Sequence, residues 1–142
     1  MQVFTVPSRR ILPDTVALYN YAGEVNDEAT YEISTISHCY CMVAEGADLN
    51  DQGRKGHDSA QLYIFDKGTE ITSTNGQTKT YLHYKEWDAL PPSERSAFWT
   101  LHDDGRDYFV KTEEGGRKFK VTKFSHKKAG SKRMWHFEVS AK

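Results

Sequence analysis

Short runs of β-type residues, each followed by a turn signal, recur along most of this chain. In residues 60–65, Leu62 and Ile64 alternate with Tyr63 and Phe65, and in residues 134–139 the large apolar side chains again take every second position. About seven to nine such runs, many of them roughly 8–12 residues apart, are typical of an antiparallel barrel or sandwich. We therefore predict a mainly β fold, an antiparallel β-barrel or small sandwich with one short helix.

Local signals locate the helix and several turns. Tyr84, Trp87 and Leu90 have helical spacing, and Pro91-Pro92 ends that segment. Asn75-Gly76 between two β-type runs predicts a type I′ hairpin turn, and residues 23–27 have the composition of a turn. The alternation in residues 30–43 slips near Thr35, which predicts a β-bulge there. Residues 99–101 and 107–111 are expected to form a hairpin around the turn at 102–105.

The length of 142 residues predicts one domain. Residues 1–11 have the composition of an extended N-terminal arm, and residues 12–142 form a single β-rich domain. Residues 45–59 are polar, contain three glycines and show no periodicity, which predicts a long mobile loop. No run approaches the ~18 apolar residues of a membrane span, and the start lacks the pattern of a secretory signal, so we expect no membrane association.

Charge is distributed unevenly along the chain. Residues 106–142 contain 11 Lys/Arg and four Asp/Glu, a net charge of +7, whereas residues 1–105 have a net charge of −8. If the two parts face different sides, the molecule attracts copies of itself head to tail or lays its basic side on phosphate. An ordinary solvated surface is the alternative interpretation.

The sequence predicts no catalytic residues, metal ligands or cofactor. Cys39 and Cys41 lie two apart, so in a strand they share one side with parallel Cβ vectors, a poor geometry for a disulfide. His38 next to Cys39 is the one candidate for a zinc ligand, but adjacent strand residues face opposite ways and no second ligand pair exists. We interpret both cysteines as buried, and we expect a protein that is not an enzyme.

Nucleic-acid binding is an alternative. Residues 119–124 interleave Lys120 and Lys123 with Phe119 and Phe124, a pattern that suits both a single-stranded nucleic-acid groove and a barrel strand with one wet face. The sequence does not separate the two, so a small nucleic-acid-binding module stays open as a hypothesis.

Six stretches of the chain, taken in order, resemble a family of small uncharacterised structural proteins of tailed phages and prophages, encoded between the capsid and tail-tube genes. The most specific of them contains Met134-Trp135-His136, and the next contains Asp58-Ser59-Ala60. The resemblance covers roughly residues 12–142. The stretches are residues 12–20, 58–65, 85–91, 99–101, 107–113 and 130–139.

This resemblance implies a structural component of the virion neck that is assembled in the bacterial cytoplasm. The implied role is a head-closure (head–tail connector) subunit that acts by forming a hexameric or dodecameric ring; a tail terminator or another tail-side neck protein is the alternative. The implied partners are copies of itself, the portal or adaptor, tail proteins and, non-specifically, packaged DNA. Combined with the charge pattern, it leads us to expect subunit or partner contacts at Val3, Phe4, Arg9, Arg10, Asp48, Asp51, Arg54, Lys55, Lys127, Lys128, Lys132 and Arg133.

Overall fold

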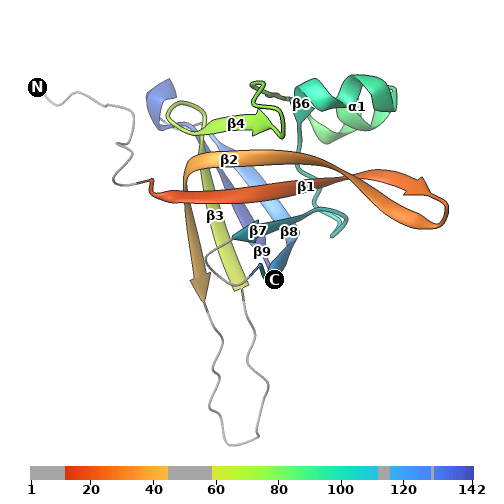
Figure 1. The fold of residues 1–142 in the computed structure, drawn as a ribbon. Coiled ribbons are helices and arrows are strands. Elements are labelled where there is room, and N and C mark those ends of the chain that lie inside the picture. Colours follow the sequence, from red (N-terminus) through yellow and green to blue (C-terminus); the bar gives the residue numbers. More distant parts are fainter. Residues whose placement is uncertain (1–11, 45–58, 112–115, 129) are drawn as a thin grey trace, which may run out of the picture.

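A computed structural model describes residues 12–44, 59–111, 116–128 and 130–142 of the chain (Figure 1). Strands dominate this part, as the sequence predicted. In chain order the elements are β1 (Asp14–Val25), β2 (Glu28–Ala44), β3 (Ser59–Phe65), β4 (Glu70–Ser73), β5 (Thr80–Tyr81), α1 (Tyr84–Ala89), the 3-10 helix η1 (Pro92–Ala97), β6 (Phe98–Trp99), β7 (Tyr108–Lys111), β8 (Lys118–Lys127), the 3-10 helix η3 (Lys132–Met134) and β9 (His136–Ala141).

The long strands close into a barrel. Going round the wall, β1 pairs with β7, β7 with β8, β8 with β9, β9 with β3, β3 with β2 and β2 again with β1, and every pairing is antiparallel. Closure removes the exposed edges that a flat sheet would present. The strand β4 lies outside this circuit, against the middle of β2. The predicted antiparallel β class is confirmed, and the closed circuit makes it a barrel.

Strand β2 pairs first with β1 and then with β3, and it contains a bulge close to this change of partner. The register with β1 shifts between Asp14 and Thr15, opposite His38, whose φ is 58°. Before the bulge Ser34 and Ile36 are buried, and after it Cys39 and Cys41 are buried. The predicted bulge exists, but it lies at His38 rather than near Thr35. The sequence pattern was misleading because the inward positions include Ser34 and two cysteines, while the large Tyr40 and Met42 face outward.

Beyond the barrel, β1 and β2 continue as a two-stranded ribbon. Only residues 16–19 of β1 pair with β7, whereas the pairing with β2 runs on to Val25. Asn26 and Asp27 form the turn with φ values of 54° and 65°, the positive values that a type I′ hairpin turn needs. Gly23, which we predicted to belong to the turn, lies at a register shift within the ribbon. Figure 1 shows the ribbon projecting to the right of the barrel.

Helix α1 lies beside β6 and above the β1–β2 ribbon in Figure 1, and its Trp87 is completely buried. The predicted hairpin of residues 99–101 with residues 107–111 is wrong. Strand β6 instead pairs in parallel with β5, and β7 joins the barrel wall between β1 and β8. A turn does follow β4 near Asn75-Gly76, but Gly76 alone has a positive φ, so the turn is not type I′.

The barrel interior is filled by the apolar side chains that alternate along the strands. Fully buried examples are Leu18, Ile36, Leu62, Phe109, Phe119 and Val139. Their neighbours in sequence point outward, which leaves the outer wall for charged and aromatic side chains.

Candidate functional site

A basic turn joins β8 to β9 and packs around an aromatic side chain. The ammonium groups of Lys128 and Lys132 lie 5.5 and 5.8 Å from the centroid of the Trp135 ring. A cation held over an indole face at such distances is attracted by the ring quadrupole. Lys127 and Arg133 are exposed on the same turn. The structure therefore brings together the four predicted contact residues of this segment, and we call Lys127, Lys128, Lys132, Arg133 and Trp135 the basic turn.

A pocket of about 510 Å³ opens beside the basic turn, between β3, β4, β5, β6 and the adjoining ends of β8 and β9. Its inner wall is mainly aromatic. The Phe137 ring lies 4.7 Å from that of Tyr81 and 5.2 Å from that of Trp99, and Ile64 and Ile71 complete the apolar surface. A volume of this size and an apolar lining are typical of binding pockets.

The mouth of the pocket is polar and connects directly to the basic turn. The imidazole of His126 stacks on Phe137 with centroids 4.0 Å apart, and its Nε2 lies 2.8 Å from a carboxylate oxygen of Asp66. The backbone N–H of Asp66 donates to the carbonyl of Trp135 at 2.9 Å. Pocket and basic turn thus share one rim, so a partner that contacts one of them also reaches the other.

One buried cation lies in the pocket wall. Lys79 is 5% exposed, and its Nζ donates to the carbonyl oxygen of Ile33 at 3.1 Å. Burial lowers the pKa of Lys79, and the negative charge of Glu32 offsets part of that effect. Lys79 therefore connects the pocket wall to β2 through its hydrogen bond with Ile33.

The ribbon carries the opposite charge. From β1 through β2, residues 14–44 contain five Asp/Glu and no Lys/Arg, whereas residues 118–142 contain eight Lys/Arg and one Glu. Val25, next to the turn of the ribbon, is 60% exposed. We call Glu24, Val25, Asp27 and Glu28 the acidic tip.

The acidic tip and the basic turn lie apart in the molecule. Figure 1 shows the end of the β1–β2 ribbon at the right and η3, which belongs to the basic turn, at the upper left. The uneven charge seen along the sequence is therefore also a separation in space for the described residues. Such a molecule has a dipole that orients it towards other charged bodies, copies of itself included.

Tyrosines cover the outer face of the sheet where the ribbon leaves the barrel. The rings of Tyr19 and Tyr108 stack 4.5 Å apart, and Tyr31 meets Tyr108 edge-on at 5.1 Å. We did not predict this cluster from the sequence. The sequence hints at this cluster only because Tyr19 and Tyr21 alternate along one strand and therefore face the same side, with Tyr31 on the next strand. The strand register shows that these tyrosines meet.

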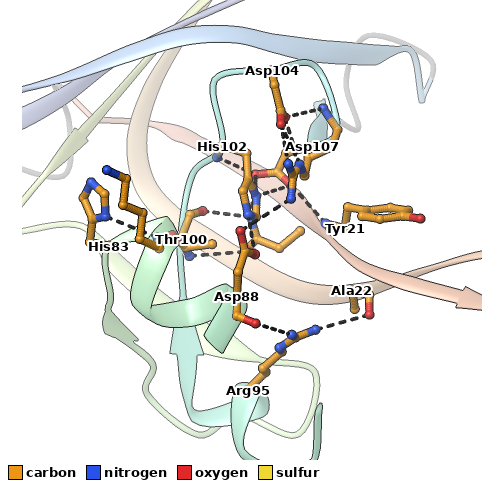
Figure 2. Close-up of polar contacts among 12 residues, drawn as sticks. Tyr21, Ala22, His83, Asp88, Arg95, Thr100, His102, Asp104 and Asp107 are labelled. Atoms are coloured by element: carbon orange, nitrogen blue, oxygen red, sulfur yellow. Dashed lines mark hydrogen bonds and ion pairs between the residues drawn. The ribbon is translucent and has the colours of Figure 1, made fainter. Parts of the chain in front are cut away.

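A second polar cluster is buried under α1 (Figure 2). His102 Nδ1 lies 2.9 Å from Asp107, and its Nε2 lies 2.8 Å from Asp88 of α1. Asp107 also accepts hydrogen bonds from the side chain of Asn20 and from the backbone N–H groups of Tyr21 and His102. We call His102, Asp107 and Asp88 the buried clasp, because they tie α1 to β1 and to the loop before β7.

The geometry of the buried clasp is suited to holding α1 against β1 and the loop before β7, and less suited to catalysis. His102 is 1% exposed and Asp107 is fully buried, and both imidazole nitrogens face carboxylates. Burial lowers the pKa of His102, but the hydrogen bonds and charges of Asp107 and then Asp88 outweigh it and raise that pKa above its ordinary value. A doubly engaged imidazolium has no nitrogen left to exchange a proton with a ligand.

Both cysteines lie on the buried side of β2, as predicted, and they form no disulfide with each other. Burial first, and then the nearby Cys41 and Asp14, raise the pKa of Cys39 to about 12. A thiol with so high a pKa is a poor nucleophile at neutral pH. Within the described residues no three His, Cys, Asp or Glu side chains are grouped to hold a metal ion, and no helix there is long and apolar enough to cross a membrane.

The other predicted contact residues lie outside the described residues. These are Val3, Phe4, Arg9 and Arg10 of the predicted arm, and Asp48, Asp51, Arg54 and Lys55 of the predicted loop. The pocket was not predicted from the sequence because its lining comes from six strands and the segments between them. Asp66 and His126 are 60 residues apart, and no local pattern connects them.

Residues 11–142 match the model of a family of unknown function (DUF6751), so the chain belongs to that family. No curated protein and no solved structure matches the chain.

Proposed function

We propose that this member of a family of unknown function is a structural protein of the neck of a tailed-phage or prophage virion, most specifically a head-closure subunit that works by assembling into a hexameric or dodecameric ring. The observation that carries the proposal is the separation of the acidic tip from the basic turn on one molecule. The resemblance of the sequence to phage proteins encoded between capsid and tail-tube genes supplies the biological setting.

Opposite charges at separated places favour a head-to-tail contact between copies. In such a heterologous interface each subunit offers one surface to the copy before it and another to the copy after it, and a ring results when the rotation closes. Complementary charges bring the correct surfaces together and repel the incorrect pairings. The proposed mechanism is mechanical: the ring closes the channel through which DNA entered the head and offers a docking surface to the tail.

The assembly step is tested by light scattering and electron microscopy of the purified full chain at low and high salt. We expect oligomers that dissociate as salt rises, since screening weakens exposed charge pairs. Two charge-reversed proteins, Glu24→Lys/Glu28→Lys and Lys128→Glu/Lys132→Glu, should each assemble poorly. Their mixture should form pairs, because each retains one wild-type surface that fits a wild-type surface on the other. Lys85→Glu on the exposed face of α1 is the matched control. A wild-type chain that stays monomeric at high concentration contradicts the proposal.

The biological step is tested by deleting the gene from its phage or prophage. A head-closure subunit should be needed for stable DNA-filled heads that accept a tail. The deletion should therefore give heads without tails and heads that lose DNA. Tails of uncontrolled length would instead indicate a tail terminator, and intact infectious particles would exclude both roles.

A nucleic-acid-binding module is the second candidate, and the basic turn is the observation that favours it. Trp135 flanked by Lys128 and Lys132 combines an aromatic face with cations, as in sites that bind single strands. Retention of DNA in a mobility-shift assay, falling steeply with salt and lost in Lys128→Glu/Lys132→Glu but not in Lys85→Glu, would support it. Equal retention by the two variants would remove it.

A further inference from the structure

The pocket beside the basic turn has the features of a receptor for an apolar group with negative charge around it. Its inner wall is aromatic. Exposed lysines lie next to its rim: Lys67 follows the lining residue Asp66 in the β3–β4 turn, and Lys128 lies over the ring of Trp135, whose centroid is 6.4 Å from that of the His126 ring. The lining itself contains two carboxylates, Asp66, which His126 engages at 2.8 Å, and Glu70, together with the cation of Lys79. The positive charge offered to a partner therefore comes from Lys67 and the basic turn beside the pocket.

The acidic tip has the complementary features. Val25 is 60% exposed, the highest value among the exposed large apolar side chains of the described residues. Glu24, Asp27 and Glu28 surround it in sequence. The type I′ turn at Asn26 and Asp27 defines the conformation of the tip. A preformed protrusion loses little conformational freedom on binding, which favours affinity.

We propose that the pocket binds the acidic tip of a second copy of this chain, with Val25 on the aromatic wall and the acidic side chains against Lys67 and Lys128. This inference rests on the proposed function and makes it specific, because it names the two surfaces that meet in the ring. The occupant is a second copy because one chain contains, at separated places, an exposed apolar side chain flanked by acidic residues and an aromatic pocket beside lysines. A head-to-tail contact of this kind repeats from copy to copy.

Disulfide trapping provides a direct test. Val25→Cys protein and Thr78→Cys protein are mixed under mild oxidation, since Thr78 lies exposed at the pocket. We expect a covalent heterodimer on a non-reducing gel, formed faster than in a mixture of Val25→Cys with Lys85→Cys, where the second thiol lies on α1. The native thiols are buried, and the high pKa of Cys39 slows its reaction. Equal rates in the two mixtures would overturn the inference.

A substitution at the tip separates this inference from the proposed function. Val25→Asp should weaken self-association at least about tenfold, because it moves a charge onto an apolar wall at the centre of the contact. Val25→Ile keeps the apolar character and should preserve assembly. If Val25→Asp forms rings as well as the wild type does, ring assembly stands and the pocket assignment is wrong. If the wild type does not self-associate at all, both are wrong. Tight binding of a small apolar molecule that leaves association unchanged would also show that the pocket has another occupant.

Discussion

Two His–Asp pairs of similar geometry occupy very different surroundings in this protein. In the buried clasp the His102 and Asp107 side chains are 1% and 0% exposed and 2.9 Å apart. At the mouth of the pocket the His126 and Asp66 side chains are 23% and 26% exposed and 2.8 Å apart. The distances are nearly equal, so the burial of the two pairs and the groups around them decide what each pair does.

Asp107 of the buried pair has several protein donors, whereas His126 and Asp66 are partly exposed to solvent. Asp107 accepts hydrogen bonds from Asn20, from the backbone of Tyr21 and from both the ring and the backbone of His102. Removing one member of such a group leaves its partners unsatisfied in a place that water does not reach. Water replaces a missing partner at the rim. The buried clasp therefore stabilises the fold, whereas the pair of His126 and Asp66 lies where a partner can reach it.

The largest expected effect is the loss of stability in Asp107→Ala. We expect the free energy of unfolding to fall by about 3–5 kcal/mol, because the change uncouples a buried ion pair and orphans several donors. Asp66→Ala should cost no more than about 1 kcal/mol, the range of exposed pairs. Urea denaturation of both variants beside the wild type measures the difference. Equal losses in the two variants would show that burial does not make the clasp pair more important for stability than the exposed pair.

The next effect is a dependence of stability on pH that belongs to the clasp. The pKa of His102 is raised in the folded protein. Its contribution is therefore complete below the unfolded-state pKa of about 6.5 and is lost as pH rises through the higher folded-state pKa. Asp88→Asn removes one of the charges that raise this pKa, so its loss of stability should begin at lower pH. Denaturation curves at a series of pH values test this, with Val25→Ile, which changes no titratable group, as the variant that should keep the wild-type dependence.

The smallest expected effect on stability comes from the basic turn. Lys128→Glu/Lys132→Glu replaces two exposed side chains, and surface changes of this kind usually shift the free energy of unfolding by about 0.5 kcal/mol or less each. Self-association measured on the same samples should fall clearly. If the variant lost stability and association together, the basic turn would be needed to stabilise the folded monomer and would not be only a contact surface.

Much of the fold was predictable from local patterns. Alternating runs such as residues 60–65 identified strands, and Trp87 with Pro91-Pro92 identified the short helix and its end. Prediction failed where pairing is not local. Residues 99–101 and 107–111 are close in sequence, yet β6 pairs with β5 and β7 with β1 and β8. Buried contacts of Asn20, Asp107 and His102 direct the chain between them, and no alternation of apolar residues reports such contacts.

The candidate site likewise has one part that was predictable from local sequence and one part that was not. Lys127, Lys128, Lys132 and Arg133 were predicted as one basic segment, because charges close in sequence stay close in space. The pocket beside them required residues from β3, β4, β5, β6, β8 and β9. Its two rim residues, Asp66 and His126, meet only because β9 pairs with both β3 and β8.

The amino-acid sequence by itself determined the β class, the approximate strands and the segregation of acidic from basic residues, since each is set by side chains that are near neighbours in the chain. The tertiary structure decided the closure of the barrel, the bulge at His38, the buried clasp and the pocket. These depend on which strands pair and in what register, and the free energy of that choice comes from contacts between residues far apart in sequence.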